Sequence, residues 1–241
     1  MSFIIILMVT CLFVPVAAKS IRTVPRLWYG LALAIDVLYV YGIVFSLPPM
    51  ILQVLSAVVQ RGMLGTSLFI IVMYCGVFPE RSYVRKTVGP IRAELSIIAC
   101  ILVFAHSLNY LNSYLGVLLF GIGAVSINQL ASLLIAIVLF ALMLVLGATS
   151  LKSLRCRIKT GVWKNIQRTS YVFFALIYIH EVLILYPPAL KGSGEALPTL
   201  MVSTMVFFAY FVLRVVRYFI DRRERNSRMN VDLNAKEAKG A

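Results

Sequence analysis

Seven long apolar runs are the feature that most constrains how this chain folds. Each is close to the roughly 20 residues that a helix needs to cross a bilayer. The hydrocarbon interior offers no water to backbone N–H and C=O groups, so a crossing segment must satisfy them internally, as a helix does. The pattern predicts an all-α integral membrane protein with about seven transmembrane helices, at about 3–18, 27–46, 62–78, 93–111, 127–149, 165–186 and 197–219.

The composition agrees with this class and names the lipid bilayer as the first partner. Hydrophobic residues make up 61% of the 241 positions and charged residues only 13%, against about 25% in soluble domains. The mean hydropathy is +0.93. The net charge of +14 comes largely from short segments between the apolar runs, which is the pattern of cytoplasmic loops rather than of a nucleic-acid-binding face. We therefore expect no nucleic acid partner.

The connections between the runs alternate in basic content, which predicts the direction of each helix. The second connection contains only Arg61, the fourth no Lys or Arg and the sixth only Lys191. Because cytoplasmic loops are enriched in Lys and Arg, the N-terminus is expected outside and the C-terminus in the cytoplasm. The basic residues of the odd connections are Lys19, Arg22 and Arg26, then Arg81, Arg85, Lys86 and Arg92, then Lys152, Arg155, Arg157, Lys159 and Lys164.

The two ends of the chain have different sequence patterns. The first run resembles a signal peptide in length, but no basic residue precedes it, and Lys19 and Arg22 follow it, so we expect a retained span. We treat 1–26 as an extra N-terminal helix with a basic loop, and 27–220 as a six-helix core. The polar stretch 221–241 is expected to be a disordered cytoplasmic tail.

Both histidines of the chain, His106 and His180, lie inside apolar runs. An ionisable side chain in a bilayer is costly and is a functional candidate, although a neutral, hydrogen-bonded packing role is the plain alternative. Each histidine lies about 14–15 residues, or roughly 21–23 Å, from the cytoplasmic end of its helix. Two imidazoles at one depth on two helices can supply both axial ligands of a heme iron.

Several short motifs resemble the ferric-reductase-like transmembrane family, which includes the membrane domains of NADPH oxidases and ferric reductases. The likeness is closest in style to the heme membrane subunit of the bacterial periplasmic methionine sulfoxide reductase system. It covers roughly 27–220 and implies a bacterial plasma membrane location. The motifs are Gly62-Met63-Leu64-Gly65 to Tyr74, Pro90-Ile91-Arg92-Ala93-Glu94-Leu95 leading to His106, Thr149-Ser150, and Trp163-Lys164-Asn165-Ile166-Gln167-Arg168 with Tyr171 leading to His180.

The resemblance implies b-type heme held by His106 and His180, and it also shows a departure. The family's second, inner heme uses histidines about 13–14 positions earlier, where this chain has Arg92 and Gln167. Neither residue is an ordinary heme ligand, so one heme b is expected. We expect no cytoplasmic flavin and nicotinamide domain of the NADPH oxidase kind, so a membrane quinol or a separate protein is the expected electron donor.

Three further residues are candidates for supporting roles. Arg61, at the outer end of its span, is a candidate partner for heme propionates, or else an interfacial anchor. Glu181 is a candidate for proton relay or for pairing within the bundle. Asp36 lies mid-span and is either part of a quinone or proton site or a structural hydrogen-bonding group.

The leading hypothesis is a membrane b-type cytochrome subunit of an oxidoreductase system. It would bind iron only as heme, through His106 and His180, and transfer single electrons from a quinol or partner protein to an acceptor outside the cytoplasm. That acceptor is expected to be a secreted or periplasmic redox protein, or ferric iron. Two alternatives stay open: a proton-coupled transporter or channel that uses the intramembrane histidines, and a heme-free membrane scaffold.

Overall fold

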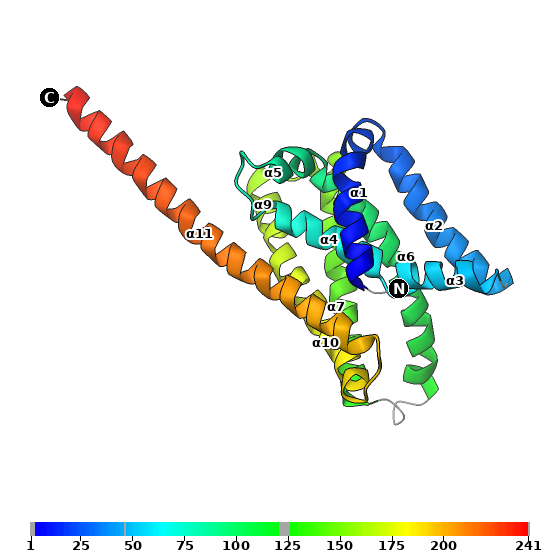
Figure 1. Cartoon of the computed structure of the whole chain (residues 1–241). Coiled ribbons are helices and arrows are strands. Elements are labelled where there is room, and N and C mark those ends of the chain that lie inside the picture. Colours follow the sequence, from blue (N-terminus) through cyan, green and yellow to red (C-terminus); the bar gives the residue numbers. More distant parts are fainter. Residues whose placement is uncertain (1–2, 46, 121–125, 241) are drawn as a thin grey trace.

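The computed structural model describes residues 3–45, 47–120 and 126–240, and this part of the chain is helical with short connections and no strand (Figure 1). The long helices are α1 (Phe3–Thr23), α2 (Pro25–Phe45), α4 (Met63–Cys75), α6 (Arg92–Phe120), α7 (Ile127–Ser150), α10 (Ser170–Leu190) and α11 (Ala196–Gly240). The short helices are α3 (Pro49–Leu55), α5 (Tyr83–Val88), α8 (Lys152–Arg155) and α9 (Thr160–Arg168), with a π-helical turn at Ser56–Gln60 and a 3-10 turn at Gly89–Ile91.

Six helical stretches within the described residues are long and apolar enough to cross a membrane. They are Phe3–Thr23, Pro49–Cys75, Tyr83–Tyr114, Ile127–Ser150, Thr160–Leu190 and Ala196–Asn226. The prediction of an all-α, multi-pass membrane protein is therefore supported at this level. A helix also forms at the predicted second span, as α2, but α2 is not among the six, so the count of seven stays a prediction.

Helix α4 lies at the centre of the packing and contacts both α1 and α6. Most of its side chains are buried, from Ser67 through Met73. Close approach to α6 depends on Gly65, because a Cβ at this position would lie 2.3 Å from Cγ2 of Val103. A small residue lets two helix backbones approach within a membrane, where van der Waals packing rather than the hydrophobic effect drives association.

Helix α7 packs against both α6 and α10, and its start is fixed by local sequence. The hydroxyl of Ser126 accepts a hydrogen bond from the backbone N–H of Gln129, and the Gln129 side chain accepts one from the Ser126 backbone N–H. This reciprocal capping satisfies two backbone donors at the helix start. It also sets the register of α7, which places Ser132 opposite α10.

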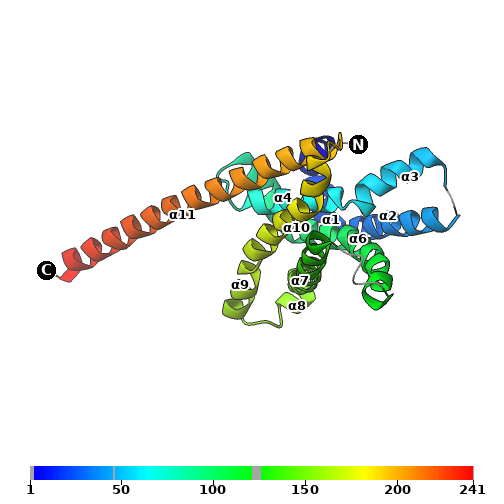
Figure 2. The same ribbon diagram turned by 90° about the horizontal axis from the view of Figure 1, so that it is seen from below.

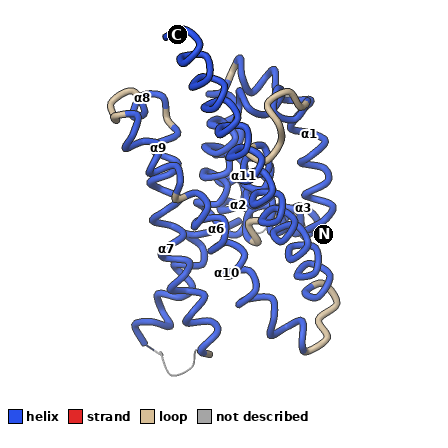
Figure 3. Tube along the Cα trace, turned by 90° about the vertical axis from the view of Figure 1, so that its left-hand side faces the viewer, coloured by secondary structure: helices blue, strands red, loops and turns tan. Residues whose placement is uncertain are grey.

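The basic connections share one end of the bundle. In Figure 1, α5, α9 and the link between α1 and α2 lie at the upper end, and Figure 3 places α8 and α9 at the end from which the C-terminus projects. The predicted direction of each helix across a membrane stays a prediction. Which end faces the cytoplasm stays a prediction.

The C-terminal segment is helical in the structure, and the expected disorder of the tail stays a prediction. Helix α11 continues without interruption to Gly240 and projects well beyond the bundle (Figure 2). The sequence from Arg222 to Gly240 is rich in Arg, Glu and Lys, which favour helix. An ion pair at helical spacing, Arg217 Nε to Asp221 Oδ1 at 2.9 Å, supports the helix where it leaves the apolar region.

Candidate functional site

A cavity of about 910 Å³ lies within the bundle, and both histidines line it. Its walls come from α4, α6, α7, α10 and the start of α11, and most of the lining side chains are apolar, such as Phe69, Leu139 and Phe140. The volume falls within the range of about 300–1,000 Å³ typical of cofactor and ligand sites. We call this space the histidine cavity.

His180 is held on α10 by contacts with α7. Its Nδ1 atom lies 3.1 Å from the backbone carbonyl oxygen of Ser132 and 3.0 Å from the Ser132 hydroxyl. A carbonyl oxygen only accepts hydrogen bonds, so Nδ1 donates to it only in the tautomer that carries the ring proton on Nδ1. The lone pair on Nε2 is then available to a metal, an arrangement common among metal-binding histidines.

His106 is packed against an unusual turn before α4. Gly62 has a φ of +63°, and a Cβ at this position would lie 3.3 Å from Nδ1 of His106. The ring of Tyr110, one turn later on α6, lies 4.9 Å from the imidazole centroid. The left-handed backbone of Gly62 and its missing side chain together make room for this ring.

An ion pair lies on the lining of the cavity near the connection between α10 and α11. Arg61 Nη1 lies 2.8 Å from Glu195 Oε2, and both side chains are at least half exposed. The hydrogen bond and charge of Arg61 hold the pKa of Glu195 below its ordinary value. Arg61 therefore lies beside the cavity and already has an acidic partner, and its expected contact with a heme propionate stays a prediction.

The acid next to His180 also faces the cavity. Glu181 lines it, and Oε1 accepts a hydrogen bond of 2.6 Å from the Ser203 hydroxyl on α11. The other oxygen, Oε2, is buried without a hydrogen-bond partner among the described residues. A buried carboxyl group with one unsatisfied oxygen is costly and is a candidate for proton handling.

Arg92 and Gln167 occupy different environments. Arg92 lines a separate, basic pocket, whereas Gln167 Nε2 donates a 3.0 Å hydrogen bond to the Thr149 hydroxyl on α7. Asp36 lines neither cavity; it is buried on α2, and its Oδ1 has no hydrogen-bond partner in the described part of the chain.

The donor set of the histidine cavity fits a heme better than a metal ion held by protein ligands alone. No group of three or more His, Cys, Asp or Glu residues gathers within the described residues. Two imidazoles suffice for heme, because the porphyrin supplies the other four ligands to the iron. The Nδ1 contacts of His180 leave Nε2 without a described partner, and the cavity volume also agrees with this requirement.

The sequence pattern indicated the two histidines and Arg61 as candidates. It did not indicate the three residues that contact them in the structure. Ser132 and Glu195 each reach the site from another segment, and no motif distinguishes them from other serines and acids. Gly62 stands within the motif that carries the family resemblance, yet only its positive φ reveals its contact with His106.

Comparisons with known proteins assign no activity. No protein-family model matches the chain, and no solved structure matches it. An uncharacterized protein of Treponema pallidum (strain Nichols) is 34% identical over 151 residues, which is 63% of this chain and 42% of that protein. The chain thus spans less than half the length of this relative.

Proposed function

We propose that this protein is the membrane subunit of an electron-transfer system and holds one b-type heme between His106 and His180. The observation that carries the proposal is that the only two histidines of the chain, on α6 and α10, line one cavity of cofactor size. The likeness of its motifs to the ferric-reductase-like family points in the same direction.

The residues of the chain have separable roles in this proposal. His106 and His180 bind the iron, and Ser132 orients His180 through Nδ1. Apolar side chains from α6 and α7 exclude water, which lowers the local dielectric and helps set the reduction potential. Arg61, beside the cavity, would bind a propionate in competition with Glu195. The heme would supply one-electron chemistry.

The proposal also includes an electron donor and an electron acceptor for the heme. A quinol within the bilayer is the proposed donor, which the resemblance to the membrane subunit of the methionine sulfoxide reductase system suggests. The proposed acceptor is a secreted or periplasmic redox protein, or ferric iron, on the side of the histidine cavity. Glu181 lines the cavity. In this proposal it would exchange a proton near the heme when the charge of the heme iron changes.

The direct test is a reduced-minus-oxidised absorption spectrum of the full chain, purified after expression with ample heme. We expect low-spin b-type bands in the wild type and none in His106→Ala or His180→Ala. The matched control is Ser107→Ala, which also lines the cavity but whose hydroxyl bonds to Val103 of its own helix; it should keep the bands. A wild type without heme bands would overturn the proposal.

The donor is tested separately under anaerobic conditions. Menadiol, a soluble quinol, should reduce the heme of the wild type as completely as dithionite does. If dithionite reduces the heme and menadiol does not, the cofactor assignment stands and the quinol donor is wrong.

A second candidate function is proton-coupled transport, and Glu181 is the observation that favours it. The carboxyl group and His180 are neighbours that both line the cavity, and one carboxyl oxygen lacks a hydrogen-bond partner among the described residues. A protein of this kind would move protons in heme-free proteoliposomes, and Glu181→Gln would abolish the flux. Flux that is absent from the wild type would exclude this candidate.

A further inference from the structure

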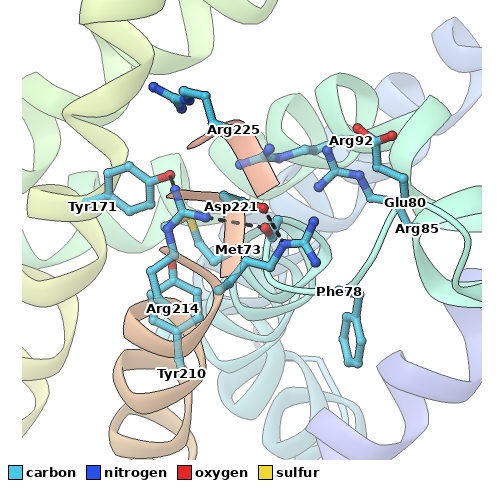
Figure 4. Close-up of a pocket in the computed structure, with 12 residues that line it drawn as sticks. Met73, Phe78, Glu80, Arg85, Arg92, Tyr171, Tyr210, Arg214, Asp221 and Arg225 are labelled. Atoms are coloured by element: carbon cyan, nitrogen blue, oxygen red, sulfur yellow. Dashed lines mark hydrogen bonds and ion pairs between the residues drawn. The ribbon is translucent and has the colours of Figure 1, made fainter. Parts of the chain in front are cut away.

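A second cavity, of about 370 Å³, is lined by charged side chains at the other end of the same helices. We call it the arginine pocket. Figure 4 shows Arg214 and Tyr171 on one side, Arg85, Arg92 and Glu80 on the other, and Arg225 above them. Its charged residues are Arg85, Arg92, Arg214, Arg217 and Arg225, with Glu80 and Asp221.

Two of these arginines are fixed in place by neighbouring groups. Arg85 Nη1 donates a 3.0 Å hydrogen bond to the carbonyl of Cys75, at the end of α4. Arg214 donates to the carbonyl of Gly76 and to the Tyr171 hydroxyl, and its guanidinium lies 4.8 Å from the centre of the Tyr171 ring. A guanidinium has five N–H donors, so each retains donors for a ligand.

The positive charge of the pocket is largely uncompensated within the described residues. Asp221 pairs with Arg217, while Glu80 forms no ion pair there. Five arginines against two acids leave an excess of three positive charges. Arg85, Arg92, Arg214 and Arg217 are only partly exposed, so water screens their mutual repulsion less than at an open surface. A bound anion would remove this repulsion.

The charged residues that α11 contributes to the pocket lie along one face of the helix. Arg214, Arg217, Asp221 and Arg225 follow one another at spacings of three and four residues, which brings them to the same side of a helix. That side faces α4 and α6, which contribute Met73 and Arg92 to the pocket. The site is thus built from several helices rather than from one charged helix surface.

We propose that the arginine pocket binds a phosphate-bearing anion. Guanidinium groups match phosphate geometry with paired hydrogen bonds, and several arginines converge on one small space. The phosphate has two natural sources: the headgroup of an anionic phospholipid, which basic pockets between transmembrane helices bind, or a soluble phosphate compound. Neither histidine lines this pocket, so the binding does not depend on heme.

The experiment uses the full chain, purified in detergent and stripped of lipid. Native mass spectrometry compares the binding of anionic phosphatidylglycerol with that of zwitterionic phosphatidylcholine. Calorimetry compares the binding of inorganic pyrophosphate with that of chloride. The variants are Arg92→Gln and Arg225→Gln, because neither side chain donates a hydrogen bond to a described residue. Arg157→Gln, exposed in the connection between α8 and α9, is the control.

Each pocket variant should weaken binding at least about tenfold, the effect of losing one charge-assisted contact, and the control should match the wild type. Loss for phosphatidylglycerol alone identifies a lipid headgroup, and loss for pyrophosphate alone identifies a soluble phosphate. The proposal is overturned if the wild type binds neither anion above its reference, or if both variants bind as the wild type does. Because Arg225 is exposed, Arg225→Gln stays informative if Arg92→Gln fails to fold.

Discussion

The histidine cavity and the arginine pocket are built from opposite ends of the same four helices, α4, α6, α10 and α11. On α6, several residues between Val103 and Tyr114 line the cavity, whereas Arg92 lines the pocket. The cavity walls are mostly apolar, with a few polar groups held by hydrogen bonds to other helices. The pocket walls are mostly charged and open beside basic connections.

This difference shows how one bundle provides two electrostatic environments. In the cavity, a low dielectric makes each polar contact strong, so a few residues such as Ser132 and Glu181 decide what binds. In the pocket, several arginines share the binding and no single one decides it. The two regions should therefore respond to mutation independently, and losses in the cavity should be the larger.

The largest expected effect is a double dissociation between the two regions. His180→Ala should lose all heme while keeping anion binding, because the imidazole is irreplaceable as an axial ligand. Arg225→Gln should keep one heme and weaken anion binding at least about tenfold. Heme content and pyrophosphate or lipid binding measured on both variants check this, and a variant that loses both properties would show that the regions are coupled.

The next effect concerns the close packing of α4 against α6. Gly65→Ala places a Cβ 2.3 Å from Val103, and the overpacking should cost about 2 kcal/mol of stability. Thermal unfolding in detergent should show a clear fall in Tm. Gly30→Ala is the control, since nothing lies within 4 Å of that Cβ on exposed α2. Equal Tm values for the two variants would contradict the close approach.

A smaller effect separates backbone strain from contact with His106. Gly62 and Gly192 both have positive φ, at +63° and +75°, so alanine at either should cost about 1–2 kcal/mol. Only at Gly62 would the new Cβ touch the imidazole. Gly62→Ala should therefore change the low-spin heme signal in electron paramagnetic resonance, and Gly192→Ala should not.

The smallest effect is the pH dependence of the ion pair between Arg61 and Glu195. Because Arg61 lowers the pKa of Glu195 in the folded protein, the pair stabilises the fold fully above the unfolded pKa of about 4.5. This contribution is lost as the pH falls through the lower folded pKa. The Tm of Glu195→Gln should lie slightly below that of the wild type at pH 7 and converge with it under acid conditions. Glu224→Gln, on exposed α11, should show no such convergence.

The sequence predicted the helical membrane class, the helix positions and the candidate histidines, because these follow from long apolar runs and from rare polar residues within them. It did not predict the partners across helices. The contact of Ser132 with His180 and the gathering of Arg92 with Arg214 depend on how each helix is rotated about its axis.

The central claim is that this chain binds one heme through two histidines. Heme quantified per chain, by pyridine hemochromogen and amino-acid analysis of the purified protein, tests it most directly. We expect one heme b per chain, because Arg92 and Gln167 lie in separate environments and neither is an ordinary ligand. Two hemes per chain would contradict the reading of those positions, and no heme would contradict the claim itself.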